Sequence, residues 1–270
     1  MPVITKITAQ KKLKDRYNIF TDAGDGEKYA FSVDEDVLIK HQLKKGMELD
    51  DFALTEILFQ DDIRKAYGQA VQYLATRMRS EFEVRQQLKK KEVAEPIVNE
   101  VIHKLYYHQF INDQEFSLAF VRTQMNTTDK GANVIKQELK EKGINASLIE
   151  NALLEYPFEM QLEKAITLSN KYLPKNTRDS GKIAKQKVEQ MLVRKGYSFE
   201  IIKEANNHID GSKDENEEME ALRKQGEKLV QKYKLYSGYE FSQKIKQTLY
   251  RKGFSIDQID QFLSEVENQE

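Results

Sequence analysis

Along most of the chain, apolar residues recur at intervals of three and four positions, with Lys, Glu, Gln and Arg between them. The stretch "VEQMLVRKGYSFEII" at residues 188–202 returns as "IKQTLYRKGFSIDQI" at residues 245–259, with the residue types in the same order. Apolar residues eight and four positions before a glycine, such as Val188 and Leu192 before Gly196, lie on one helical face. The stretch therefore predicts an amphipathic helix with a charged exposed side.

The glycine inside this stretch predicts the end of one helix and the start of the next. Glycine adopts the left-handed conformation that closes a helix, and the apolar residue after it, here Tyr197, can fold back onto the last turn. Ser198 can then cap a second helix, with Glu200 in its first turn, where a negative charge is favourable. The stretch encodes a helix-glycine-helix element.

The same element occurs four times. A third copy surrounds Gly143, and a fainter fourth copy has Glu92 where the glycine should stand. The four positions, 92, 143, 196 and 253, are 51, 53 and 57 residues apart. A further run of apolar residues at helical spacing precedes each copy, so each unit is predicted to hold three helices. Units of about 50 residues are marginally stable alone, so we expect neighbours to support one another in an elongated array.

The first residues have a different pattern. "VITKITAQ", "RYNIFTD" and "KYAFSV" alternate apolar and polar positions and contain β-branched and aromatic residues, which predicts strands with one buried face. "AGDGE" between the last two predicts a hairpin turn; the alternative, a phosphate-binding loop, lacks the Lys-Ser/Thr pair that should follow it.

The predicted fold is thus mainly α, an elongated array of tandem three-helix repeats with a small β-rich N-terminal module. The predicted boundaries are 1–60 for the β-rich module, 61–110, 111–157 and 158–209 for repeats 1 to 3, and 210–270 for an acidic linker and repeat 4. The acidic stretch "DGSKDENEEME" at residues 210–220 is interpreted as a solvated linker or helix start rather than a docking tail.

Composition excludes several classes of site. The chain has no Cys, which excludes disulfides and thiolate-bound metals, and its four His residues are scattered, which argues against a metal site. No nucleophile has a recognisable partner at catalytic spacing, so we expect a binding protein without cofactors rather than an enzyme. Asp113 in "FINDQEF" is interpreted as the N-cap of its own helix. No signal peptide or membrane-spanning run is evident, so a cytoplasmic protein is expected. We also expect a monomer.

Charge adds one surface feature. The net charge is only −1, and the middle of the chain, residues 61–207, holds 24 Lys and Arg against 20 Asp and Glu. Basic residues recur in the last turn of the same helix in every unit: Lys89, Lys90, Lys91, Lys140, Lys142, Arg194, Lys195, Arg251 and Lys252. Two interpretations remain open: favourable charges at helix C-termini, or a periodic basic stripe suited to a periodic partner, either a protein filament or a nucleic-acid backbone.

Three stretches resemble the signatures of a known family, the RecX regulators of bacterial recombination. "YLATRMRSEFEVRQQL" at residues 73–88 resembles the opening signature, "FINDQEFSLAFVRTQ" at residues 110–124 the second, and "KGANVIKQELKEKGI" at residues 130–144 the third. The resemblance covers residues 67–205, and the fourth repeat and β-rich start are similar to the longer members from Gram-positive bacteria. Two residues depart from the family pattern. Ser117 stands where the family usually has alanine, and we expect its side chain to lie at a helix surface. Glu92 stands where the family usually has the glycine that ends the middle helix of the first unit.

The resemblance implies a function that periodicity alone does not give. RecX-like proteins bind the RecA recombinase and its filament on single-stranded DNA, and they inhibit filament growth, ATP hydrolysis and strand exchange. The alternative is a helical-repeat protein that binds single-stranded or double-stranded DNA directly through its basic turns.

The candidate partner-binding residues form a basic face rather than a pocket: Arg77, Arg79, Arg122, Lys130, Lys140, Lys142, Arg194 and Lys195. Arg79 could instead pair with Glu83, four residues further on. Five aromatic residues could stack on nucleic-acid bases, although most stand at positions expected to face the core or to follow a helix end. They are Tyr106, Tyr107, Phe110, Tyr197 and Phe254.

Overall fold

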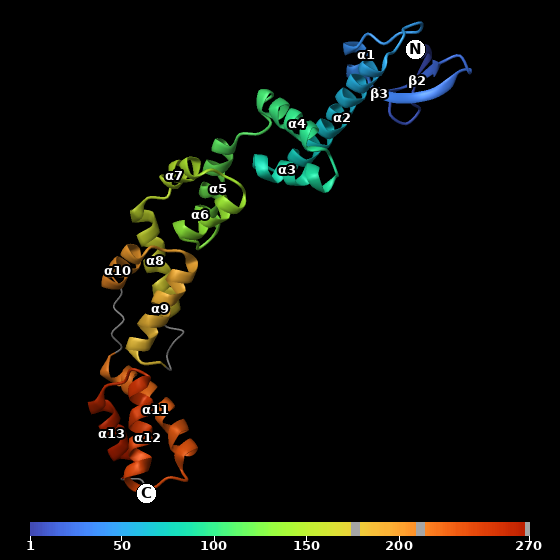
Figure 1. Ribbon diagram of the computed structural model, residues 1–270. Helices are drawn as coiled ribbons and strands as arrows, with labels where there is room; N and C mark the ends of the chain where they lie inside the picture. The colour runs from blue at the N-terminus through green and yellow to red at the C-terminus, as the bar shows by residue number, and fades with distance from the viewer. Residues whose placement is uncertain (174–178, 209–213, 268–270) are drawn as a thin grey trace. The chain divides into compact units, whose positions relative to one another are not determined.

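The computed structural model describes residues 1–173, 179–208 and 214–267. Across these residues, thirteen helices follow a three-stranded sheet, which confirms the mainly α fold with a β-rich start (Figure 1). The chain forms two compact units, Met1–Ser117 with Glu141–Leu148, and Leu118–Lys140 with Ile149–Glu270. Of the acidic stretch at residues 210–220, interpreted as a linker or helix start, residues 210–213 lie outside the described residues, and residues 215–220 form the start of a helix.

The N-terminal module is an antiparallel sheet in the order β1-β2-β3, followed by a short helix. Its elements are β1 (Val3–Ala9), β2 (Arg16–Asp22), β3 (Lys28–Asp34) and α1 (Glu35–Lys40). The "AGDGE" turn joins β2 to β3, and Asp22 Oδ1 accepts hydrogen bonds from the N–H groups of Gly24 and Gly26 at 2.7 and 3.0 Å. The hairpin prediction is therefore confirmed.

The remaining helices follow in threes, as the repeat pattern predicts. Repeat 1 comprises α2 (Asp51–Leu74), α3 (Glu81–Lys90) and α4 (Glu95–Tyr107). Repeat 2 comprises α5 (Asp113–Thr127), α6 (Ala132–Glu141) and α7 (Ala146–Leu153). Repeat 3 comprises α8 (Phe158–Tyr172), α9 (Gly181–Lys195) and α10 (Phe199–Asn207). Repeat 4 comprises α11 (Glu215–Tyr233), α12 (Gly238–Arg251) and α13 (Ile256–Glu267).

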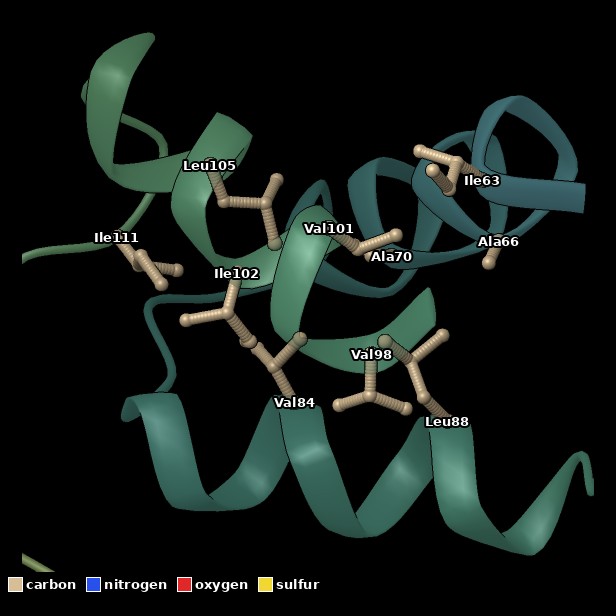
Figure 2. Packing of buried hydrophobic residues seen from close by; sticks show 10 residues of the cluster. All are labelled: Ile63, Ala66, Ala70, Val84, Leu88, Val98, Val101, Ile102, Leu105 and Ile111. Carbon is tan, nitrogen blue, oxygen red and sulfur yellow. The ribbon is translucent and has the colours of Figure 1, made fainter. Parts of the chain in front are cut away.

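The apolar face of each repeat's middle helix is buried, as its spacing predicts. In repeat 1, Val84 and Leu88 on α3 point toward Val98 and Ile102 on α4, and all four lie in one apolar cluster (Figure 2). The equivalent pairs in the later middle helices are also fully buried: Ile135 and Leu139, Val188 and Leu192, Ile245 and Leu249. Apolar burial at this spacing supplies the main stabilisation of each repeat.

Helix α2 joins the N-terminal module to repeat 1. It runs across residue 60, with Ile57 in the core of the module and Ala66 and Ala70 in the core of repeat 1. Between them, the buried carboxylate of Asp61 accepts hydrogen bonds from Arg16 at 2.8 Å and from the backbone N–H of Asp34 at 2.8 Å. The sheet is thus tied to the first repeat by a buried charge as well as by apolar contact.

Helix ends follow the predicted chemistry. Gly143, Gly196 and Gly253 all have left-handed backbones, with φ of 75°, 87° and 85°. The apolar residue after each glycine is buried: Ile144, Tyr197 and Phe254. The predicted caps of the third helices also form: Asn145, Ser198 and Ser255 each accept a hydrogen bond from a backbone N–H three residues later.

The first copy ends its middle helix in the same conformation without glycine. Glu92 is exposed and has a φ of 60°, a region in which a side chain is strained. Helix α3 nevertheless ends at Lys90. The helix end is therefore as sharp as in the other copies, at a cost in backbone strain.

Replacing Glu92 with glycine is expected to stabilise repeat 1 by about 1 kcal/mol, because glycine adopts this conformation without strain. The measurement is the urea midpoint of unfolding. Glu100→Gly is the control, since the same substitution at an exposed position inside helix α4 should lower the midpoint. A lower midpoint for Glu92→Gly would show that the left-handed residue is not strained.

Candidate partner-binding surface

The middle helices of successive repeats meet end to end. At each junction, a donor at the N-terminus of one middle helix bonds to the carbonyl just before the glycine of the next repeat. The hydroxyl of Ser80 donates to the Lys142 carbonyl at 2.7 Å, and the hydroxyl of Ser180 donates to the Lys252 carbonyl at 2.6 Å. At the junction of repeats 2 and 3, the backbone N–H of Gly131 donates to the Lys195 carbonyl at 2.7 Å.

The glycines are required by this close approach as well as by their backbone conformation. A Cβ on Gly143 would lie 2.4 Å from the Cβ of Phe82, and one on Gly196 would lie 2.5 Å from the backbone nitrogen of Val134. A Cβ on Gly253 would lie 2.6 Å from Ser180 Oγ. No repeat precedes the first, which explains why its equivalent position tolerates a glutamate. Sequence reasoning found the glycines but attributed them only to helix termination.

Two of the predicted basic residues converge on a single carboxylate. Glu83 pairs with Arg77 at 2.7 Å and with Lys142 at 3.3 Å. Burial alone would raise the pKa of Glu83, but hydrogen bonds from Arg77 and the Ser80 backbone, together with the charge of Lys142, lower it. Glu83 also completes the capping box of α3 with Ser80. Arg77 and Lys142 therefore hold the junction of repeats 1 and 2.

The suggested pair between Arg79 and Glu83 is wrong. The Arg79 guanidinium lies 3.7 Å from the ring centroid of Tyr73, and its Nε donates to the Tyr73 carbonyl at 3.0 Å. Arg79 therefore interacts with the ring and the carbonyl of Tyr73 near the C-terminus of α2. The carboxylate of Glu83 pairs with Arg77 instead.

Three further basic residues are paired in the second unit. Arg122 forms an ion pair with Glu155. Lys130 lies 2.5 Å from Glu138, and Lys195 lies 3.4 Å from Asp129. These are partly exposed pairs, each of which contributes little to stability, so a charged partner could compete for them.

Arg194 and Lys140 differ from the other six. Both are exposed, and neither makes an ion pair or a side-chain hydrogen bond within the described ranges. Among the eight predicted residues, these two present an uncompensated positive charge.

Two open hollows lie at equivalent places in repeats 3 and 4. The first is lined by Val193, Arg194 and Phe199, and the second by Tyr250 and Ile256. Val193 and Tyr250 stand three residues before the repeat glycine, and Phe199 and Ile256 stand three residues after it. Phe199 is 82% exposed and Tyr250 60% exposed. Sequence reasoning missed this pattern because it treated exposed positions only by their charge.

In repeats 1 and 2 the same positions are not large apolar residues. Repeat 1 has Lys89 and Glu95, which form an ion pair at 3.1 Å, and repeat 2 has Lys140 and Ala146. Of the four repeats, only repeats 3 and 4 therefore have large, exposed apolar residues three positions before and after the repeat glycine. Exposed clusters of large apolar residues are typical of protein interaction sites.

Asp113 does not cap its own helix, contrary to the prediction from sequence. Asn112 does so, because its Oδ1 accepts from the backbone N–H groups of Gln114 and Glu115. Asp113 Oδ1 instead accepts from the N–H of Glu81 at 2.8 Å, at the start of α3. Ser117, expected at a helix surface, is fully buried and donates to a backbone carbonyl.

Burial raises the pKa of Asp113, and the nearby charges of Glu81 and Glu83 raise it further, against the hydrogen bond from the Glu81 backbone. A raised carboxyl pKa means that ionisation destabilises the folded state, and the penalty is complete above the folded pKa. Asp113→Asn should therefore raise the melting temperature at pH 7 and leave it unchanged below the ordinary carboxyl pKa of 3.8. Asp257→Asn, in an exposed first turn, is the control. A stabilisation that is equal at both pH values would contradict this origin.

The aromatic residues divide into two groups. Tyr197 and Phe254 are buried behind the repeat glycines and cannot stack on a ligand. Tyr106, Tyr107 and Phe110 are 41%, 78% and 48% exposed around the end of α4. Only this second group is available for contact.

No described helix has the length and apolar character needed to cross a bilayer. In the described ranges, no three His, Cys, Asp or Glu side chains gather as a metal site would require.

Comparison with known proteins covers nearly the whole chain. The sequence model of the regulatory protein RecX N-terminal domain matches residues 2–50. Models of the first and second RecX three-helix domains match residues 66–105 and 112–153. The model of the third RecX three-helix domain matches twice, at residues 159–205 and 216–263, so repeat 4 is similar to repeat 3.

Whole proteins and solved structures agree with these matches. Regulatory protein RecX of Bacillus thuringiensis (strain Al Hakam) and that of Bacillus cytotoxicus are each 46% identical over 263 residues, which is 97% of this chain and 97% of each relative. A crystal structure of regulatory protein RecX superposes with a TM-score of 0.68 at 37% identity, covering 77% of this chain and 100% of that one. The crystal structure of RecX from Lactobacillus salivarius superposes with a TM-score of 0.54 at 38% identity, covering 56% of this chain and 98% of that one. With four domain models matched in order and relatives aligned over almost its full length, the chain belongs to the RecX family of regulatory proteins.

Proposed function

We propose that the chain is a cytoplasmic, monomeric and non-enzymatic regulator of the RecA recombinase. It binds the RecA filament on single-stranded DNA, and it inhibits filament growth, ATP hydrolysis and strand exchange. The observation that carries this proposal is family membership along almost the whole chain, from the N-terminal module to repeat 4.

The eight basic residues remain the proposed partner-binding face, and they differ in the contacts that they make within the chain. Arg77, Arg79 and Lys142 are engaged in contacts that hold repeat 1 and its junction, so their removal would also perturb folding. Arg122, Lys130 and Lys195 are in exchangeable pairs. Lys140 and Arg194 are the proposed primary contacts, because each can bind a partner carboxylate without breaking an existing pair.

The two hollows support a partner that is itself periodic. A hollow with an exposed aromatic or aliphatic rim occurs at the same place in repeats 3 and 4, lined by Arg194 in one and by Lys244 and Lys246 in the other. Successive protomers of a filament would present the same apolar and acidic group to each hollow. A single compact partner has no reason to match a site that is present in both of the last two repeats.

Arg194→Glu is expected to weaken inhibition of RecA about tenfold, because the substitution removes one exposed contact to a partner carboxylate and puts a negative charge in its place. The measurement is the concentration that halves RecA ATP hydrolysis on single-stranded DNA. Lys228→Glu, an equally exposed charge reversal on α11, serves as the control and should inhibit like the wild type. Helix content measured by circular dichroism should be the same in all three proteins. Equal inhibition by Arg194→Glu and the wild type would exclude Arg194 from the contact.

The wild-type protein tests the proposal itself. As the chain is titrated into RecA with single-stranded DNA and ATP, hydrolysis should fall at well below one copy per RecA, because blocking the growing end of a filament affects many protomers. Undiminished hydrolysis at a twofold excess of the chain, at low salt, would refute the proposal.

A further inference from the structure

A hollow in the first unit combines cations with exposed aromatic rings, and the RecA proposal makes no use of it. It lies among α1, α2 and α4 and has a volume of about 430 Å³, within the range of roughly 300–1,000 Å³ typical of small-ligand sites. All of its lining residues fall between Asp36 and His108. The N-terminal module and repeat 1 therefore both contribute to its wall.

Each of the three helices contributes one cation to the lining: Lys40 from α1, Arg64 from α2 and Lys104 from α4. Arg64 is held in place by Asp34 at 3.2 Å and Asp36 at 3.0 Å. Lys40 donates to the neutral amide oxygen of Gln60 at 3.0 Å, so its charge is not compensated by that contact. Lys104 makes no ion pair with any described residue. The hollow therefore retains positive charge from Lys40 on α1 and Lys104 on α4.

The aromatic side of the hollow is formed by Tyr107, His108 and Tyr67. Tyr107 is 78% exposed, and its ring meets His108 edge to face, with centroids 5.1 Å apart. His108 in turn meets Tyr67 at 6.1 Å. The ring of Tyr107 is thus supported from one side by a partly buried network, while the rest of its surface faces solvent.

Helical spacing places the two kinds of group side by side. Lys104 on α4 is one turn before the C-cap residue His108, and His103 is one turn before Tyr107, so a cation lies next to the aromatic rings at the end of the helix. A ring beside a cation fits a flat aromatic base attached to a phosphate. An acidic peptide would use the cations but would leave the Tyr107 ring without a matching group. Duplex DNA keeps its bases inside the stack, where the ring cannot reach them.

We propose that this hollow binds one nucleotide of a single-stranded nucleic acid, with the base against the Tyr107 ring and the flanking phosphates on Lys40 and Lys104. The site contacts the nucleic acid directly and does not depend on RecA. It would give the N-terminal module and repeat 1 a role separate from that of the hollows in repeats 3 and 4.

The test is fluorescence anisotropy of a labelled oligothymidylate of about 16 nucleotides with the full-length chain and no RecA. Tyr107→Ala should weaken binding at least about fivefold, since stacking of one base on an aromatic ring contributes at least about 1 kcal/mol. Tyr239→Ala is the matched control, because Tyr239 is 81% exposed on α12 and should leave the affinity unchanged.

The two lysines have their own readout. The double variant Lys40→Gln and Lys104→Gln should reduce the slope of log affinity against log salt by about 1.4, or about 0.7 for each phosphate that is no longer neutralised. The matched control is Lys224→Gln with Lys228→Gln on α11, which should leave that slope at the wild-type value. An oligomer of the same length with abasic sugars should bind the wild type as weakly as oligothymidylate binds Tyr107→Ala.

Several outcomes would overturn the proposal. These are no binding of oligothymidylate by the wild type, equal binding by Tyr107→Ala, equal binding of the abasic oligomer, or displacement of oligothymidylate by polyglutamate that persists in Tyr107→Ala and is lost in the Lys40→Gln and Lys104→Gln double variant. The last outcome would assign the hollow to an acidic peptide. Because RecA is absent from the assay, each result stands whether or not the chain inhibits RecA.

Discussion

Gly131→Ala is expected to destabilise the protein by about 3 kcal/mol or more. A Cβ at this position would lie 2.5 Å from the backbone C and O of Gly196 and from the backbone N of Tyr197, and none of these atoms can move without shifting a helix. Gly131 does not have a left-handed backbone, so alanine is conformationally acceptable there and the cost comes from the contact alone. Overpacking costs about 1–3 kcal/mol, and the hydrogen bonds across the junction are worth about 1 kcal/mol each.

The junction bonds that Gly131→Ala would break are well defined. They are the 2.7 Å bond from the Gly131 N–H to the Lys195 carbonyl and the 3.0 Å bond from the Asn133 N–H to the Gly196 carbonyl. Faster hydrogen exchange at these two amides, with a lower urea midpoint, is the expected result. Gly68→Ala is the control, because Gly68 lies inside α2 with open space around it, and alanine there should stabilise the protein by about 0.5–1 kcal/mol. If the two variants had the same midpoint, the tight junction would not exist in solution.

Asp61→Ala should cost about 3–5 kcal/mol, the usual effect of removing one partner from a buried ion pair. Asp61 is 1% exposed, and the Arg16 side chain that pairs with it at 2.8 Å is only 13% exposed. Without the carboxylate, Arg16 would keep a buried charge and the Asp34 N–H would lose its acceptor. The strands should then exchange their amide hydrogens much faster than the helices of repeats 3 and 4.

The effect of Asp61→Ala should depend on pH. Burial opposes ionisation of Asp61, but hydrogen bonds from Arg16, Lys65 and the Asp34 backbone outweigh burial and lower its pKa. A lowered carboxyl pKa contributes stability that is present above the unfolded value of 3.8 and is lost as the pH falls through the folded value. The deficit of Asp61→Ala should therefore be full at pH 7 and should shrink in strong acid. Asp62→Ala, on the exposed side of the same helix, should change stability by less than about 1 kcal/mol.

Much of the fold can be predicted from sequence because it is encoded locally. The spacing of Val188 and Leu192 before Gly196 specifies a buried helical face, and the glycine specifies where the helix ends. Both features depend on residues fewer than ten positions apart. The hairpin at Asp22 and the caps at Asn145 and Ser198 follow for the same reason.

The junctions could not be predicted, because their partners are distant in sequence. Ser80 and Lys142 are 62 residues apart, and Asp113 bonds to a helix that begins 32 residues before it. The basic residues illustrate the same limit. The sequence placed Arg77 and Arg194 in one candidate basic face, but only tertiary packing distinguishes Arg77, which binds Glu83, from Arg194, which is free among the described residues.

Growth of RecA filaments already nucleated on single-stranded DNA is the most direct test of the proposed regulation. Labelled RecA is added to short filaments, and the rate of lengthening is followed with increasing amounts of the chain. Lengthening should stop at a small fraction of one copy per RecA, and Arg194→Glu should require about ten times more protein for the same effect. Filaments that lengthen at an unchanged rate in a molar excess of the wild-type chain would show that it does not control RecA through its filament.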